Sequence, residues 1–201
     1  MAEGNNWRSK DIKVMTQEQL IKKIEDIQGL FFPRIMRDRA LICVLYLTGG
    51  RVGEVVRKGF LGTGKDGLCK EDINTLSRNK RKFRIFDLRN LKSEKRKRKE
   101  LPVAEDDPLN AKMLEYVDQY MENLLPTEPL FPISIRRAQE IVKKHMGQDI
   151  SPHYFRHMRM THLARDKGLN EWELATYAGW DSTSSAKSYV HDDPKKLFAK
   201  L

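Results

Sequence analysis

The sequence has little cysteine: Cys43 and Cys69 are the two cysteines among its 201 residues. Two cysteines cannot build the dense disulfide framework of a small secreted domain. No Cys/His spacing typical of a zinc site occurs either. Cys43 lies within an apolar run, so we expect it in the core. Because there is no disulfide framework, we expect the chain in a reducing compartment.

Long apolar segments are missing as well. The longest apolar run, Ala40 to Leu47, is too short to cross a bilayer, and the first ten residues contain no apolar signal region. There is no P-loop, no G-x-G-x-x-G fingerprint and no internal repeat. The carboxylates are scattered, without the spacing of a two-metal nuclease. We therefore expect an intracellular protein without a metal or a nucleotide cofactor.

Positive charge is what the sequence has in excess. Its 38 lysines and arginines against 28 acidic residues give a formal net charge of +10 at pH 7. This balance favours a polyanionic partner, with nucleic acid the leading case, although basic charge also serves solubility alone. The length suits one domain with room for a sizeable core.

Apolar periodicity and capping residues predict a mainly helical chain. Residues 1–12 are polar and are expected to form a flexible arm. Thr16 and Gln19 form a capping-box pattern at the start of a helix. A helix after Pro33 holds the longest apolar run and is the expected core helix, ended by Gly49. Further helical pieces are predicted over 52–58, 108–124, 135–145, 151–167 and 171–178, with a short helix or turn over 182–190.

One segment has the alternation of a β-strand. Residues 83–91, FRIFDLRNL, alternate apolar and polar side chains. The basic run KSEKRKRKE follows, and residues 101–103 close a predicted β-hairpin. Residues 59–82 are rich in Gly, Lys, Asp and Asn and are predicted to form a long loop. The expected fold class is therefore mainly α with a small antiparallel β-sheet, an α+β fold.

Two basic clusters are candidate DNA contacts. For the hairpin tip, contact with backbone phosphates is favoured over a solvated or nuclear-targeting run. For the helix over 135–145, a position along a DNA groove and a solvated face are equally compatible with the sequence. The candidate residues are Lys95, Arg96, Lys97, Arg98 and Lys99 in the tip and Arg136 and Arg137 in the helix.

The stretch from Ser151 to His191 holds the residues best suited to chemistry. Ser151 is a plausible N-cap, so His153 and Arg156 lie at i and i+3 on one face of the first helical turn. Unpaired backbone N–H groups at this helix end favour a phosphate. A histidine and an arginine converging on a phosphate, with Tyr189 downstream, suggest phosphoryl transfer through a tyrosyl intermediate.

Three motifs in this order resemble the catalytic domain of the tyrosine recombinases, also called the phage integrase family. They are TGGRVGE at 48–54, HYFRH at 153–157, and AGW at 178–180 followed by Tyr189. Each motif alone is weak, but the ordered set is fairly specific and covers roughly residues 13–191. The resemblance implies a catalytic domain over 13–191 and a tail over 192–201 that docks on a neighbouring protomer. Many members also carry an N-terminal DNA-clamping domain, for which the first 12 residues leave no room. The sequence is therefore expected to be either a fragment of a longer protein or a minimal enzyme that binds weakly or relies on a partner.

The resemblance implies a catalytic role for four residues of this set. Arg51 and Arg156 would grip the non-bridging oxygens of the scissile phosphate, because a guanidinium bonds bidentately and stays charged. Tyr189 would attack the phosphorus and form a covalent 3′-phosphotyrosine. His153 would accept the tyrosine proton or bond the phosphate.

Four further residues would complete the set. Lys92, favoured over Lys95, would protonate the departing 5′ oxygen. The position usual in the family, eight residues before Pro102, holds Glu94 here. Trp180 would buttress Tyr189 with its ring, since an indole cannot do acid–base work. Glu54, three residues from Arg51 on a helix, would orient Arg51 by a charge-assisted bond. His157 would be structural.

Three functions are compatible with these residues. The leading interpretation is a site-specific DNA recombinase that acts on double-stranded DNA as a tetrameric synapse. A type IB topoisomerase uses a related residue set, and a catalytically silent DNA-binding module is the third possibility. The spacing from AGW to Tyr189 favours the recombinase. In each case the expected location is cytoplasmic, associated with a nucleoid or a virus.

Overall fold

The computed structural model describes residues 14–56, 67–89 and 98–190. These residues form seven α-helices, two short 3-10 helices and one three-stranded sheet. They fall into two compact units: a larger one over 16–159, and a smaller one comprising 160–190 together with 14 and 15, so that the boundary falls within α6. The expected arm over 1–12 and tail over 192–201 lie outside the described residues.

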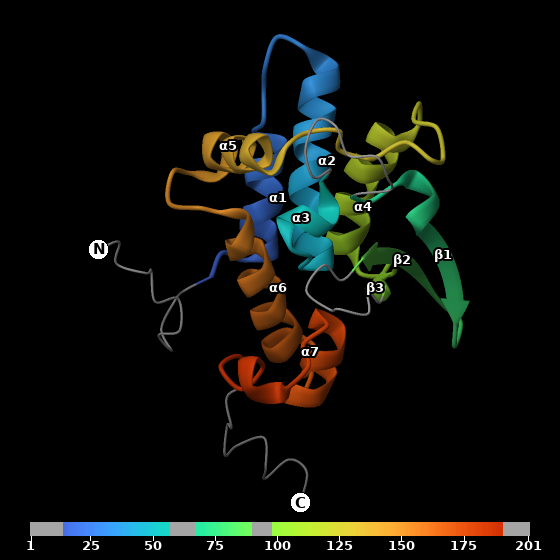
Figure 1. Ribbon diagram of the computed structural model, residues 1–201, viewed down its shortest axis with the longest axis vertical. Helices are drawn as coiled ribbons and strands as arrows, with labels where there is room; N and C mark the ends of the chain where they lie inside the picture. The colour runs from blue at the N-terminus through green and yellow to red at the C-terminus, as the bar shows by residue number, and fades with distance from the viewer. Residues whose placement is uncertain (1–13, 57–66, 90–97, 191–201) are drawn as a thin grey trace, which may run out of the picture. The chain divides into compact units, whose positions relative to one another are not determined.

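Helix α2 (Phe32–Thr48) is the centre of the larger unit, as its apolar run predicted. Every residue from Ala40 to Thr48 is buried. A helix that is apolar on all sides needs neighbours on all sides. Figure 1 shows α1 (Gln17–Glu25) and α5 (Ile135–Met146) on one side of α2, and α4 (Pro108–Met121) with the sheet on the other.

Side-chain caps fix where several of the predicted helices begin. Thr16 and Gln19 form the predicted capping box at α1. Ser134 caps α5, and Asp107 caps α4 by accepting from two backbone N–H groups. Because a helix begins with unpaired N–H groups, these local bonds make its first residue readable from sequence.

The sheet contains three antiparallel strands in the order β1 (Ile73–Arg78), β2 (Arg81–Arg89) and β3 (Arg98–Ala104). The β2–β3 pairing confirms the predicted hairpin, with Leu88 opposite Lys99. Strand β1 corrects the loop predicted over 59–82. Five of its six residues are exposed, so the strand is held by backbone pairing and has no apolar alternation to reveal it.

The smaller unit packs α7 (Glu171–Ala178) and the short helix η2 (Thr183–Ser185) on the second half of α6 (Pro152–Asp166). Its core includes Met160, Leu174 and Ala186. Asn170 caps α7 in the predicted capping box, and Gly179 ends it in the left-handed conformation.

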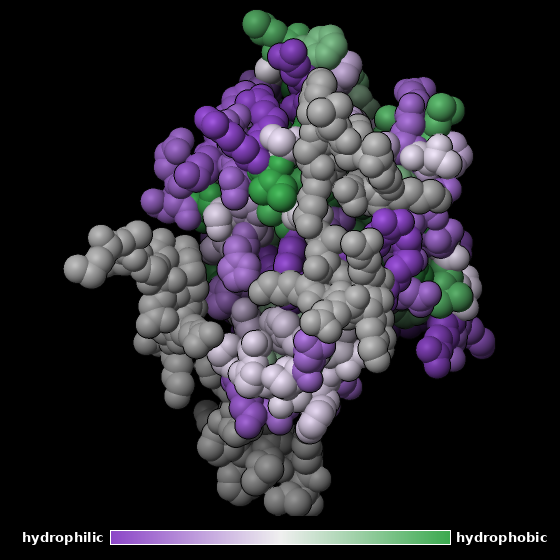
Figure 2. Space-filling model, viewed as in Figure 1, coloured by the Kyte–Doolittle hydropathy of each residue, from purple (hydrophilic) through white to green (hydrophobic). Residues whose placement is uncertain are grey.

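Exposed apolar side chains gather at one place in the larger unit. Leu30, Phe31 and Phe32 lie in or next to the connection between α1 and α2 and are exposed. Figure 2 shows this hydrophobic tip at the top of the view, with hydrophilic residues over α5. Within the part of the chain that the structure describes, no helix has the length and apolarity needed to span a membrane.

Candidate active site

The turn after α2 places Arg51 at the start of α3 (Val52–Val55). Gly49 ends α2 with φ of 56°, a left-handed conformation that glycine adopts without strain. Gly50 is also constrained, because a Cβ there would lie 2.6 Å from the Leu88 side chain of β2. The two glycines therefore let the chain turn sharply while β2 packs directly against the turn.

Glu54 holds Arg51 from one helical turn away. Its Oε1 accepts from Nη1 of Arg51 at 3.0 Å, and its Oε2 accepts from the backbone N–H of Arg51 at 2.9 Å. The charge-assisted bond predicted from the three-residue spacing is thus present. About a quarter of the Arg51 side chain stays exposed, whereas the Glu54 side chain is fully buried.

Lys99 is the second cation on the Glu54 carboxylate. Its Nζ lies 2.8 Å from Oε2, and its own side chain is only 9 % exposed. The sequence placed Lys99 in an exposed basic tip; the structure places it in β3, facing a buried carboxylate. No local pattern connects positions 54 and 99, so sequence reasoning missed this contact.

The two cations decide the charge of Glu54. Burial by itself raises the pKa of the carboxyl, but the ammonium of Lys99 and the bonds from Arg51 outweigh burial and hold the pKa below its ordinary value. Burial lowers the pKa of Lys99, and the charges of Arg156 and Arg51 act in the same direction, against the effect of Glu54. Arg156 is thus close enough to the cluster for its charge to lower the pKa of Lys99.

Arg156 reaches the same turn from α6. Its Nη1 donates to the carbonyl oxygen of Gly49 at 2.8 Å, and the residue is only 3 % exposed. Gly49 lies two residues before Arg51. The structure therefore brings to one turn two arginines that are 105 positions apart in the sequence.

The two histidines of the HYFRH motif differ in their surroundings. His153 is exposed at the start of α6, and His157 is half-buried one turn later. Burial, followed by the charge of His153, lowers the pKa of His157. The structural role implied for His157 stays a prediction.

The basic hairpin tip is only partly described. Lys92, Lys95, Arg96 and Lys97 lie outside the described residues. Arg98 lies at the start of β3, and its guanidinium is engaged by the carboxylates of Asp72 and Asp87. A DNA contact by Arg98 stays a prediction, and such a contact would compete with these two carboxylates.

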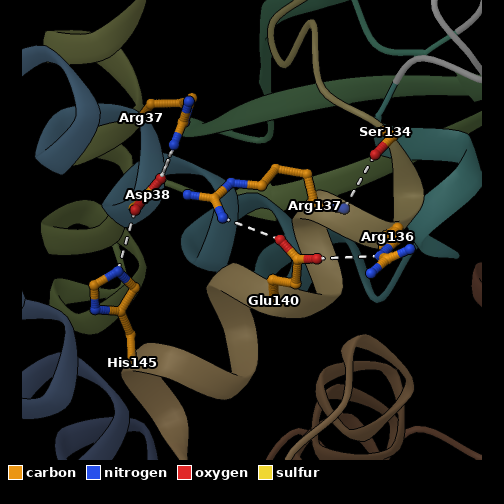
Figure 3. Close-up of polar contacts among 7 residues, drawn as sticks. All are labelled: Arg37, Asp38, Ser134, Arg136, Arg137, Glu140 and His145. Carbon is orange, nitrogen blue, oxygen red and sulfur yellow. Dashed lines mark hydrogen bonds and ion pairs between the residues drawn. The ribbon is translucent and has the colours of Figure 1, made fainter.

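Arg136 and Arg137 lie on the exposed first turn of α5. Figure 3 shows both guanidiniums directed at Glu140, with N–O distances of 3.2 and 3.0 Å. Exposed ion pairs of this kind contribute little free energy, so a phosphate can replace Glu140 at small cost. Both interpretations of this helix from the sequence, DNA contact and solvated face, agree with the geometry.

Figure 3 also shows a polar cluster that the sequence did not predict. Asp38 lies between Arg37 and His145, with Arg37 Nη2 at 2.7 Å from Oδ1 and His145 Nε2 at 3.1 Å from Oδ2. Burial raises the pKa of Asp38, but these two partners outweigh it and hold the pKa below the ordinary value. The three residues border a cavity of about 360 Å³ beside the exposed α1–α2 connection.

Trp180 and Tyr189 meet in the smaller unit. Their rings stack with centroids 5.9 Å apart and planes inclined by 18°, and both pack on the core of that unit. The ring contact expected between them is therefore present. Within residues 14–56, 67–89 and 98–190, no group of three or more His, Cys, Asp or Glu side chains is arranged to hold a metal ion.

Comparison with known proteins gives one sequence relative and several structures of the same fold. The chain is 25 % identical over 195 residues to the tyrosine recombinase XerC of Corynebacterium glutamicum, covering 92 % of this chain and 56 % of that protein. No family model matches the sequence.

Two solved structures illustrate the shared fold. The XerH site-specific recombinase bound to difH substrate in a pre-cleavage complex superposes with a TM-score of 0.63 at 14 % identity, over 92 % of this chain and 51 % of that chain. The Tn1549 transposon integrase in complex with a circular intermediate DNA superposes with a TM-score of 0.55 at 16 % identity, over 96 % of this chain and 67 % of that chain.

The chain thus spans about half the length of XerC and XerH. The fold agrees with the mainly helical class with a small antiparallel sheet that the sequence predicted. The chain therefore has distant sequence similarity to a tyrosine recombinase, and its fold is like that of the tyrosine recombinase catalytic domain.

Proposed function

We propose that this chain is the catalytic domain of a site-specific DNA recombinase that cleaves and rejoins DNA through Tyr189. The observation that carries the proposal is the pair of arginines at one turn. Arg51 is held by the buried Glu54, and Arg156 is held by the carbonyl of Gly49. Two fixed guanidiniums suit a phosphate, because a guanidinium can donate two parallel N–H bonds to the phosphate's non-bridging oxygens.

The proposed step exchanges one phosphodiester bond for another. The phenol oxygen of Tyr189 bonds to phosphorus, and the bond from phosphorus to the 5′ oxygen breaks. A phenol with a free pKa of about 10 is a weak nucleophile at neutral pH, so its proton must leave as attack proceeds. His153 takes that proton or bonds the phosphate, and Lys92 supplies one to the 5′ oxygen.

Religation reverses this step. A 5′-hydroxyl attacks the 3′-phosphotyrosine and releases the phenol of Tyr189. The phosphodiester free energy is retained in the tyrosyl link, so the cycle consumes no nucleotide. The arginines act mainly on the transition state, where negative charge on the phosphorus oxygens is greatest.

Double-stranded DNA is the proposed partner. The net charge of +10 and the exposed arginines of α5 support it. XerH was observed bound to difH substrate, and the Tn1549 integrase was observed in complex with a circular intermediate DNA. A tetrameric synapse, with residues 192–201 of one protomer docked on its neighbour, is part of the same proposal.

The test is trapping of the covalent intermediate on nicked duplex DNA in the presence of EDTA. Because the nick lets the strand that carries the 5′-hydroxyl diffuse away, religation fails and the adduct accumulates. We expect a denaturation-resistant protein–DNA adduct with the wild-type chain and none with Tyr189→Phe, which keeps the ring stacked on Trp180. Tyr177→Phe is the matched control, since Tyr177 packs on the same core.

Two outcomes would redirect the proposal. Salt-sensitive DNA binding without any adduct, on every DNA tested, would indicate a binding module. An adduct combined with relaxation of supercoiled plasmid lacking a specific site would indicate a topoisomerase of type IB.

A further inference from the structure

We propose that Lys99 is a positioning residue, which shares the Glu54 carboxylate with Arg51 and so keeps the Arg51 guanidinium oriented and available to a phosphate. The catalytic consequence rests on the function proposed above. The structural consequence, the dependence of Arg51 on Lys99, does not.

The contacts around Glu54 form one closed cluster. Its Oε1 takes a single bond from Nη1 of Arg51, and its Oε2 takes the backbone N–H of Arg51 and Nζ of Lys99. Glu54 is fully buried and the Lys99 side chain nearly so. Water therefore competes little with these bonds. Removal of one cation must change the bonding of the other cation to Glu54.

The charge of the cluster explains why a second cation matters. Arg51, Glu54 and Lys99 together carry a net charge of +1. Without Lys99 the cluster would be neutral, and the carboxylate would draw the Arg51 guanidinium fully onto itself. With the ammonium on Oε2, Arg51 gives only one Nη to Glu54, and a quarter of its side chain remains exposed toward solvent.

Lys99 also ties this arginine to the hairpin. It pairs with Leu88 across β2 and β3, and the Leu88 side chain lies directly against Gly50 of the turn that leads into Arg51. Next to Lys99, Arg98 is fixed by Asp72 and Asp87. The base of the basic hairpin is therefore joined to the Glu54–Arg51 pair by one buried ion pair, so that displacement of β3 would remove the ammonium from Glu54 and draw Arg51 onto the carboxylate.

The experiment compares Lys99→Met, which keeps the apolar stem and removes the charge, with Lys99→Arg, which restores a cation. Lys112→Met is the matched control, because Lys112 pairs with Glu115 at 3.3 Å on an exposed helix face. NMR of ¹³C-labelled glutamate and ¹⁵N-labelled arginine side chains follows Glu54 and Arg51 directly. We expect Lys99→Met to raise the titration midpoint of Glu54 and to shift the Arg51 guanidinium signals, with both effects reversed in Lys99→Arg. Arg51 signals unchanged in a folded Lys99→Met chain would overturn the proposal.

A double-mutant cycle separates positioning from direct catalysis. On nicked DNA we expect Lys99→Met to slow adduct formation on the order of tenfold in the wild-type background, within the range of coupling between contacting residues. In an Arg51→Ala background the same change should cost less than about twofold, because the arginine that Lys99 positions is already gone. Equal losses in both backgrounds would overturn the positioning role in favour of an independent one, such as proton donation.

The adduct assay and the NMR comparison test the proposed function and the positioning role separately. If the wild-type chain forms no adduct, the proposed function fails, and the NMR comparison still decides whether Lys99 positions Arg51. If the adduct forms but neither the Arg51 signals nor the cycle responds to Lys99→Met, the positioning role alone is wrong.

Discussion

Trp180 and Tyr189 stack almost in parallel, nine residues apart in the chain and on either side of the short helix η2. The indole can donate one hydrogen bond but cannot transfer a proton at neutral pH. Its contribution to the proposed reaction is therefore the surface that it offers to the phenol ring.

Truncation of this indole tests the contact. We expect Trp180→Ala to lower the free energy of unfolding by about 1–2 kcal/mol, less than for a fully buried aromatic because the ring is half-buried. Trp180→Ala should also slow adduct formation. Trp180→Phe should retain most of the stability and most of the rate of adduct formation. Urea unfolding and single-turnover trapping provide the measurements. Equal losses for Phe and Ala would assign the effect to the indole N–H instead.

Removal of Arg51 and removal of Arg156 should slow cleavage to a similar extent but differ in their effect on stability. Loss of either donor from the transition state is expected to slow cleavage on the order of 10² to 10³-fold. Arg156→Ala should also reduce the free energy of unfolding by about 1–3 kcal/mol, because it leaves the Gly49 carbonyl without this donor. Arg51→Ala should affect stability less, since Lys99 remains on Glu54. Arg165→Ala, on an exposed pair with Asp166, is the control and should change neither.

Acid stability should depend on Asp38. Its pKa in the folded chain lies below the ordinary value of 3.8. A group with a depressed folded pKa stabilises the fold above its unfolded pKa, and this stabilisation is lost as pH falls through the folded pKa. The free energy of unfolding of wild type should therefore fall as the pH drops below about 4. In Asp38→Asn the slope of unfolding free energy against pH should be smaller, by up to about 1.4 kcal/mol per pH unit. Identical slopes in urea unfolding from pH 5 to pH 2.5 would contradict this.

The arginines of α5 should contribute to DNA affinity through phosphates. If Arg136 and Arg137 each contact one phosphate, each alanine variant should reduce the slope of log K against log salt by about 0.9, independently of DNA sequence. Glu140→Gln should raise affinity, because it releases both guanidiniums from their present partner. Fluorescence anisotropy over a salt series measures both effects. An unchanged slope in both alanine variants, with unchanged affinity in Glu140→Gln, would leave the solvated face as the interpretation of α5.

Cys43 should be chemically inert in the folded chain. It is fully buried, and burial strongly raises the pKa of its thiol, so almost no thiolate is present at neutral pH. Cys69 is buried as well. We expect no reaction with a thiol reagent in native buffer and two reactive thiols in denaturant; rapid labelling of the native protein would be the opposing result.

Local chemistry is what the sequence by itself determined about this protein. The starts of α1, α5 and α7 follow from Thr16, Ser134 and Asn170, because each cap bonds a backbone group two or three residues away. The core position of α2 follows from its apolar run. The hairpin follows from alternation in β2, and the bond between Glu54 and Arg51 follows from their three-residue spacing.

Contacts between distant segments were decided only by the tertiary structure. Strand β1 lacks an apolar face, so only its pairing with β2 reveals it. The sequence placed Lys99 with a row of similar lysines and arginines. Its burial against Glu54 depends on the register of β2 and β3, which a one-residue shift would reverse. Likewise, no local spacing predicts that Arg156 meets Gly49, because that bond joins two helices whose packing brings residues 107 positions apart into contact.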